Sequence, residues 1–201
     1  MKLFGRLLFC AWAVDRGQAG ELKGKEKSTD RRNLWLSKEG LILEDSPAAK
    51  NTPPGDLQKR MRAWQEKKEK LSNTNFFVNP LRLSVRNVAK DTSEADLKRI
   101  FAKAAMDHQE KAGGGPAVKV RSSRLVSDKE RIDPVTGKGE SKGYGFVEFS
   151  TTDHALAALR VLNNCPKAAK QNGGKRLMID FSVEDARIVR QRRIKADRLA
   201  R

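Results

Sequence analysis

The chain has 201 residues, and its 42 Lys and Arg against 25 Asp and Glu give a formal net charge of +17 at pH 7. This excess is larger than solubility requires and points to a polyanionic partner, either nucleic acid or an anionic membrane surface. A hydrophobic share of 38% supports one core with extensions, and no run approaches the roughly 18 apolar residues that a membrane-spanning helix needs.

Residues 1–16 predict a β-strand whose apolar side chains alternate onto one face. The members of this face are Leu8, Cys10 and Trp12. A secretory signal peptide is the alternative interpretation, but Arg6 interrupts the apolar run that it would need. The two cysteines, Cys10 and Cys165, lack metal-ligand spacing and favour a reducing compartment over a disulfide framework.

Residues 17–79 are interpreted as a linker. Its first part, 17–30, is polar and contains several glycines, which is typical of a flexible segment. The apolar residues between 31 and 54 are too few and too interrupted to form a core, so we expect them to dock on a partner surface. Residues 56–71 are rich in good helix formers and predict a basic amphipathic helix. Its cations, expected opposite the apolar residues, are Lys59, Arg60, Lys67 and Lys70.

A more regular pattern begins at Pro80 with a strand whose side chains alternate between two faces. Its inward residues are Leu81, Leu83 and Val85. A helix is predicted over 91–105, capped by Asp91, Thr92 or Ser93. A glycine-rich break precedes a second strand over 117–126, and the charged segment 127–141 predicts a loop with an internal turn.

The third predicted strand, 141–149, carries aromatic residues on both faces. Val147 and Phe149 share the inward face, whereas Tyr144 and Phe146 point outward. A second helix then starts at a Thr/Asp cap near residue 151. The fourth strand follows, with Leu177, Ile179 and Phe181 inward and Met178 and Asp180 outward.

The order strand, helix, strand, strand, helix, strand predicts an α+β fold of the ferredoxin-like, split βαβ type over residues 80–183. Such a fold has a four-stranded antiparallel sheet with both helices on one face, which leaves the other face open. Outward aromatic side chains on that open face need a ligand or a cover.

The segment Lys142–Phe149, "KGYGFVEF", matches the longer ribonucleoprotein signature of the RNA-recognition motif at every position. The segment 83–88 resembles the shorter signature, except that Ser84 stands where the family usually has an aromatic residue. The resemblance implies that bases of single-stranded RNA stack on Tyr144 and Phe146 while Lys142 pairs with a phosphate. The missing aromatic is expected to cost about 1–3 kcal/mol of binding free energy.

The expected RNA-binding residues lie on the sheet and on the basic tail. They are Arg82, Ser84, Arg86, Lys142, Tyr144, Phe146, Met178, Arg187, Arg190, Arg192 and Arg193. Arg86 is expected to compensate in part for the missing aromatic by stacking or by binding phosphate. The alternative hypothesis is a protein-interaction module, in which a partner protein or the chain's own tail covers the aromatic side chains.

The tail, residues 184–201, predicts a basic helix that is either simply solvated, in contact with phosphates, or a nuclear address. His108 is interpreted as a helix-end residue and His154 as a helix-surface residue, and neither has metal ligands at a suitable spacing. No nucleophile elbow or phosphate-cradling loop is present in the sequence. We therefore expect a non-catalytic protein without metal or cofactor.

Several segments from about residue 31 to the end resemble the C-terminal part of the nucleolar RNA-binding protein 28 / nucleolar protein 4 family. They include "RNLWLSKEGLI", "GYGFVEF" and "KRLMIDFSVED". The resemblance implies pre-ribosomal RNA as ligand, ribosome-assembly proteins as possible partners, and a nuclear and nucleolar location. It also implies that residues 1–16 are the last strand of a preceding motif. We expect a monomer that does not contact membranes.

Overall fold

The computed structural model describes residues 32–132 and 139–199, together with the isolated positions 2–3, 6–7, 15 and 30. The chain divides into two units, residues 1–31 and 32–201. In the first unit, β1 (Lys2–Leu3) pairs with β2 (Arg6–Leu7) in an antiparallel arrangement. The predicted strand face of Leu8, Cys10 and Trp12 lies outside the described residues, so the assignment of residues 1–16 to a preceding motif stays a prediction.

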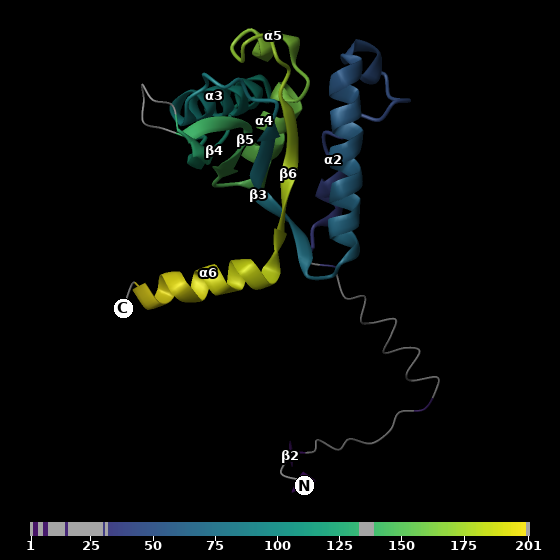
Figure 1. Ribbon diagram of the computed structural model, residues 1–201, viewed down its shortest axis with the longest axis vertical. Coiled ribbons are helices and arrows are strands. Elements are labelled where there is room, and N and C mark those ends of the chain that lie inside the picture. The colour runs from purple at the N-terminus through teal and green to yellow at the C-terminus, as the bar shows by residue number, and fades with distance from the viewer. Residues whose placement is uncertain are drawn as a thin grey trace. The chain divides into compact units, whose positions relative to one another are not determined.

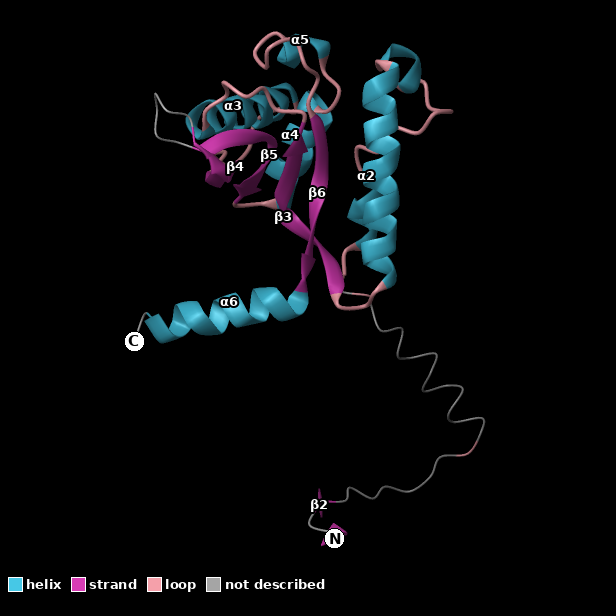
Figure 2. Cartoon of the chain, in the orientation of Figure 1, coloured by secondary structure: helices cyan, strands magenta, loops and turns pink. Residues whose placement is uncertain are grey.

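A four-stranded antiparallel sheet forms the centre of the second unit (Figure 2). Its strands lie in the order β4-β5-β3-β6, with bounds Val120–Ile132, Gly139–Phe149, Phe76–Arg86 and Met178–Asp185. The helices α3 (Glu94–Lys111) and α4 (Thr152–Leu162) both cover one face of this sheet (Figure 1). The predicted ferredoxin-like fold is confirmed.

The core lies between the sheet and these two helices. Val147 and Phe149 of β5 are fully buried, as their place on the inward face predicts. In the register, Leu83 lies opposite Val147 on one side and opposite Phe181 on the other, so that apolar side chains meet across three strands. Phe101 of α3 is fully buried against this surface.

Side-chain caps fix where both helices begin. The Ser93 hydroxyl accepts a hydrogen bond from the Asp96 backbone N–H (3.1 Å), and the Thr151 hydroxyl accepts one from the His154 N–H (3.4 Å). The helix-surface interpretation of His154 is wrong, because its side chain is only 5% exposed. It lines a small cavity between α4 and the end of α3, since these two helices pack together on the sheet.

The segment predicted as a loop over 127–141 is largely β-structure. β4 continues to Ile132 and β5 begins at Gly139, with Ser127 opposite Ser141 in the register. Backbone hydrogen bonds join the extended ends of β4 and β5, and these bonds do not depend on the side chains. Because the side chains there are mostly polar, the sequence lacks the apolar alternation from which a strand is predicted. The predicted internal turn, at 133–137, lies outside the described residues.

The segment before α2 packs its buried residues on the chain's own domain, which corrects the expectation of a partner surface for those residues; Trp35 and Leu43 stay exposed (62% and 41%). Leu36, in the short 3₁₀ helix η1 (Leu34–Lys38), is fully buried in the core. The Val78 N–H donates to the Arg32 carbonyl (2.9 Å). Gly40 has a positive φ of 74°, and its carbonyl accepts from the Asn163 side-chain amide (2.7 Å). A second short turn, η2 (Ala49–Asn51), leads into α2.

The helix α2 (Pro54–Ser72) occupies the segment where a basic helix was expected, and it packs against β3 and β6 (Figure 1). Its orientation differs from the expected one, because Arg60 and Lys67 face the domain and are only 8% and 7% exposed. Ala63, buried between them, has a side chain small enough for the helix to approach closely. The long apolar stems of the two cations fill the remaining space.

The end of the chain forms α6 (Ala186–Leu199), which follows β6 directly and has no buried residue within its described length. Figure 1 shows this helix projecting away from the sheet. The short helix α5 (Pro166–Ala169) covers one end of the core through Ala168.

Candidate nucleic-acid interface

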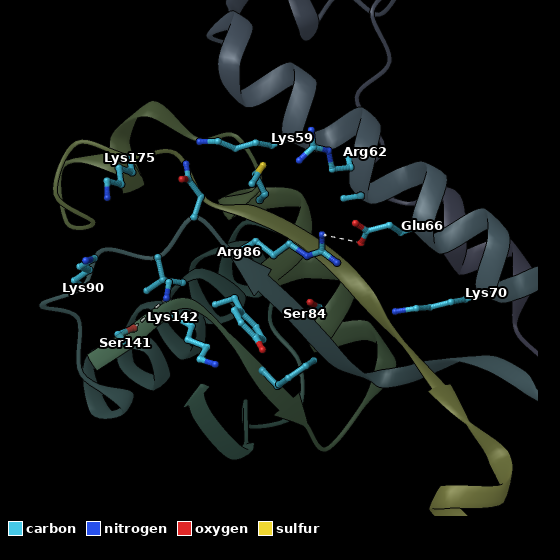
Figure 3. A pocket seen from close by; sticks show the side chains of 17 residues that line it. Lys59, Arg62, Glu66, Lys70, Ser84, Arg86, Lys90, Ser141, Lys142 and Lys175 are labelled. Carbon is cyan, nitrogen blue, oxygen red and sulfur yellow. Dashed lines mark hydrogen bonds and ion pairs between the residues drawn. The ribbon is translucent and has the colours of Figure 1, made fainter. Parts of the chain in front are cut away.

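A pocket of about 730 Å³ lies between α2 and the open face of the sheet (Figure 3). The strands β3 and β5 form its floor, and α2 forms one wall. Ser84 and Phe146 face each other across these strands in the register, as do Arg86 and Tyr144. The pocket therefore lies on the outward face that the sequence predicted.

The pocket brings together six of the eleven sequence-predicted site residues. They are Ser84, Arg86, Lys142, Tyr144, Phe146 and Met178. Met178 differs from its expected outward position, because it is only 6% exposed. It lies opposite Arg86 in the register, next to α2, and α2 shields this end of β6 from solvent.

The two aromatic rings differ in what covers them. Tyr144 is 36% exposed, and its ring meets that of Phe146 edge to face, with centroids 6.5 Å apart. The Arg82 guanidinium lies 4.3 Å from the centroid of the Phe146 ring, which is a cation–π contact. Arg82 also donates to Glu184 (3.0 Å). Arg82 is thus placed on Phe146 and does not line the pocket.

Gly145 separates the two aromatic residues for a steric reason. A Cβ atom at this position would lie 2.4 Å from the Arg124 carbonyl oxygen of the neighbouring strand. A side chain here would push β4 and β5 apart, so glycine keeps the strands close and the outward face even.

Five further cations line the pocket. Lys59 and Lys70 of α2 were identified from the sequence as cations of a basic helix, whereas Arg62 of α2 and the loop residues Lys90 and Lys175 were not. The sequence predicted a basic helix but held no signal for its position over the sheet. Electrostatic attraction to phosphate does not require contact with a base, so such cations increase the affinity for a nucleic acid whatever its base sequence.

Some of these cations already have acidic neighbours. Lys142 lies 3.6 Å from Asp128, and Lys90 forms an ion pair with Glu140. By contrast, Arg62, Lys70 and Lys175 form no ion pair with the part of the chain that the structure describes. These three side chains are exposed, and their charges face the pocket without a protein counter-ion among those residues.

Buried polar contacts hold α2 in this position. The Arg60 Nη1 donates to Asn163 Oδ1 (2.9 Å), and its Nη2 donates to the Leu177 carbonyl (3.0 Å). Lys67 forms an ion pair with Asp180 (3.3 Å). Burial lowers the pKa of the Arg60 guanidinium, while the nearby Asp180 acts in the opposite direction.

The predicted arginines of the tail lie outside the pocket. Arg187 is bound to the Asp185 carboxylate, with an Nη2–Oδ2 distance of 2.7 Å, and this hydrogen bond lowers the pKa of Asp185. The other three are exposed along α6 and are Arg190, Arg192 and Arg193. The structure thus separates the predicted site into a pocket and a remote basic helix.

Within the described residues, no helix combines the length and the apolar character that crossing a bilayer requires.

Comparison with known families gives a match to the RNA recognition motif over residues 124–167. These residues span most of β4, all of β5 and α4, and the start of α5. They include Tyr144 and Phe146, the two aromatic residues of the pocket floor.

Two curated proteins are similar over most of the chain. RNA-binding protein 28 from Homo sapiens is 34% identical over 98% of this chain, and polyadenylate-binding protein 2 from Arabidopsis thaliana is 28% identical over 80% of it. Among solved structures, domains 1 and 2 of Sex-lethal from Drosophila melanogaster match 51% of this chain and 49% of theirs, with a TM-score of 0.36 and 22% identity. The chain spans only 25% and 21% of the lengths of the two curated relatives.

Proposed function

The chain carries an RNA-recognition motif and is similar to RNA-binding protein 28 over nearly its whole length, and from this premise we propose that it binds single-stranded RNA in the pocket between α2 and the sheet. The observation that carries the proposal is the combination of two outward aromatic rings, Tyr144 and Phe146, with three cations that have no acidic partner among the described residues. Aromatic faces accept bases, and cations bind the phosphates between them.

In this proposal the bases stack on the sheet while the backbone follows the pocket wall. Tyr144 is the main stacking surface, because Arg82 already covers part of Phe146. Arg62, Lys70 and Lys175 neutralise phosphates, which releases counterions and contributes affinity that depends on salt. Binding requires no bond to be made or broken, so the protein acts as a non-catalytic RNA-binding factor.

We further propose that the RNA is pre-ribosomal and that the protein acts in nucleolar assembly of the large ribosomal subunit, together with ribosome-assembly proteins. The support is the 34% identity to RNA-binding protein 28 and the resemblance of the chain to that nucleolar family.

A second function remains a candidate because α2 covers the β6 side of the sheet. A domain whose sheet accepts one helix can accept another, and the pocket would then hold a segment of a partner protein. Such an interface buries apolar surface, so its affinity would depend weakly on salt.

The test is a titration of fluorescent single-stranded RNA at several salt concentrations. We compare the intact chain with a triple variant of the pocket, in which Arg62, Lys70 and Lys175 are changed to Ala. The matched control changes Lys98, Lys103 and Lys111 to Ala, which removes the same charge from α3 on the opposite face of the sheet.

The pocket variant is expected to lower the slope of log affinity against log salt by about 0.7 for each phosphate that is no longer neutralised. The control is expected to retain most of the slope. A slope near zero for the intact chain, or equal effects of the two triple variants, would contradict RNA binding in this pocket.

A further inference from the structure

Glu66 is the only acid among the 17 residues that line the pocket. Figure 3 shows its side chain extending from α2 towards Arg86, which rises from β3. The closest approach between the two charged groups is 3.8 Å, from Arg86 Nη1 to Glu66 Oε2. Both side chains are accessible, with 41% of Arg86 and 50% of Glu66 exposed.

A carboxylate in this position opposes the binding of a polyanion, because it repels the phosphates that the surrounding cations attract. The ion pair with Arg86 gives little in return, since exposed pairs contribute little to stability. At 3.8 Å the pair is also too long for a hydrogen bond. The two carboxylate oxygens therefore retain the capacity to accept hydrogen bonds from a ligand.

We propose that Glu66 and Arg86 together read the Watson–Crick edge of a guanine base held in the pocket. The inference rests on the proposed RNA binding and adds a preference for one base. Guanine presents one acceptor, O6, beside two donors, the N1–H and the N2 amine. Arg86 donates to O6, and the two oxygens of Glu66 accept from N1–H and N2–H.

The strand register places Arg86, and with it the Glu66–Arg86 pair, next to the position of a base stacked on Tyr144. Arg86 lies between Tyr144 of β5 and Met178 of β6. A base stacked on the Tyr144 ring can direct one edge towards β3 and α2, where Arg86 and Glu66 meet. Ser84, which stands where the family usually has an aromatic residue, is small and leaves this part of the floor accessible to the base.

The other bases fit this pair less well. Adenine and cytosine each offer the carboxylate a single amine beside an acceptor, so one oxygen of Glu66 remains without a donor. Uracil offers one N–H between two carbonyl groups, which the carboxylate repels. An unsatisfied charged acceptor in a binding site costs affinity, so these mismatches translate into selectivity.

The experiment uses the full chain and a set of ten-nucleotide RNAs that differ at one central position. The background is uridine, and the central nucleotide is guanosine, inosine, adenosine, cytidine or uridine. Inosine lacks only the N2 amine of guanosine, so it tests one of the two donors. The variant is Glu66→Gln, which keeps the size of the side chain but replaces one acceptor by a donor.

The matched control is Glu69→Gln. Glu69 lies on the same helix, is exposed, accepts from Gln65 (3.3 Å), and does not line the pocket. The Glu69→Gln substitution therefore removes one negative charge from α2, as Glu66→Gln does, but at a position outside the pocket. A third variant, Glu66→Asp, keeps a shortened carboxylate and preserves a readout if Glu66→Gln unfolds.

We expect the intact chain to bind the guanosine RNA about ten-fold more tightly than the adenosine, cytidine or uridine RNAs, with inosine in between. Glu66→Gln is expected to remove most of this preference while it strengthens binding to the uridine RNA, because a repulsive charge is lost. Glu66→Asp is expected to reduce the preference only in part, and Glu69→Gln to leave it unchanged.

Two results would overturn this inference alone. One is an intact chain that binds all five RNAs equally or prefers cytidine or adenosine. The other is a Glu66→Gln variant that binds every RNA more tightly and keeps the preference for guanosine, because Glu66 would then be only a repulsive charge. Absence of binding to all five RNAs at low salt would overturn the proposed function and this inference with it.

Discussion

Tyr144 and Phe146 occupy alternate outward positions on β5, yet the structure gives them different surroundings. The Tyr144 ring faces the pocket, whereas the Arg82 guanidinium lies over the Phe146 ring. The sequence placed both rings on the outward face because side chains alternate along a strand. It could not show the difference between them, because Arg82 belongs to another strand.

Tyr144→Ala is expected to weaken single-stranded RNA binding by about 1–3 kcal/mol, because a stacking surface is lost. The free energy of unfolding should change little, since the ring is on the surface. Tyr144→Phe is the control and should bind nearly as well as the intact chain. Titration and urea unfolding measure the two quantities, and unchanged affinity for Tyr144→Ala would favour the protein-interaction function.

Phe149→Ala tests the opposite face of the same strand. Phe149 is fully buried in the core, and removing its ring leaves a cavity that costs about 3–5 kcal/mol. Small domains are stable by only about 5–15 kcal/mol, so the loss should be large in a thermal melt. A melting temperature close to that of the intact chain would show that the register of β5 is wrong.

At the scale of elements, α2 makes polar contacts with the domain through two buried cations. Arg60 donates to Asn163 and to the Leu177 carbonyl, and Lys67 pairs with Asp180. A helix that is attached in this way depends on a few directed hydrogen bonds. Their loss should release α2 before the core itself unfolds.

Arg60→Ala is expected to lower the free energy of unfolding by about 1.5–3 kcal/mol, the usual range for hydrogen bonds to a charged group. The same variant should weaken RNA binding, because α2 contributes a wall of the pocket. Lys68→Ala is the control on the same helix, since Lys68 is exposed and does not line the pocket. Equal stability of the two variants in urea would show that Arg60 does not anchor α2.

These elements also show what the sequence could predict. The strands β3, β5 and β6 were predictable because inward apolar residues such as Leu83, Val147 and Phe181 alternate with polar ones. The docking of α2 was not predictable, because the buried residues on that helix include Arg60 and Lys67. Their hydrogen-bonding partners lie 103 and 113 residues away along the chain, beyond the reach of any local pattern.

The same distinction holds for the site. The signature around Tyr144 identified the floor of the pocket, since signature and strand order agree. The helix that forms the wall was predicted, with Lys59 and Lys70 among its cations, but its position over the sheet was missed, and so were Arg62 and Glu66 as site residues. Met178 and His154 were misplaced for a related reason, since α2 and α3 cover them and no local spacing indicates a neighbouring helix.

The helix α6 is expected to increase the affinity for RNA without changing the preference among RNA sequences. Its arginines lie outside the pocket and largely in solvent, so they can attract phosphates but have no base to read. Deleting residues 186–201 should flatten the slope of log affinity against log salt by about 0.7 for each phosphate that the tail neutralises. The order of preference among RNA sequences should stay the same, and a changed order would show that α6 is part of the reading surface.

At the scale of the whole molecule, the folded unit is longer than the motif that identifies it. The family match covers 124–167, but the unit begins near residue 32. Leu36 is buried in the core, and Arg32 accepts a backbone hydrogen bond from Val78. The segment before α2 is therefore part of the fold.

Two deletions separate these regions. Removing residues 1–30 should leave the melting temperature unchanged, because they belong to the other unit. Removing residues 1–75 should lower it clearly, because Leu36 leaves the core and α2 is lost. Calorimetry measures both. A large drop after the first deletion would show that residues 1–30 stabilise the domain.

The fork of hydrogen bonds made by Arg60 also limits how the sequence can diverge among related proteins. Lysine at position 60 would keep the charge but has a single ammonium group in place of the two guanidinium nitrogens that donate to Asn163 and to the Leu177 carbonyl. An exchange of arginine for lysine is therefore not conservative at this position. Asn163 in turn also donates to Gly40, which ties three distant segments to one amide. Relatives that keep α2 on the sheet should therefore keep or exchange positions 60 and 163 together. Relatives in which the segment equivalent to α2 does not pack on the sheet should show no constraint on the residue aligned with position 60.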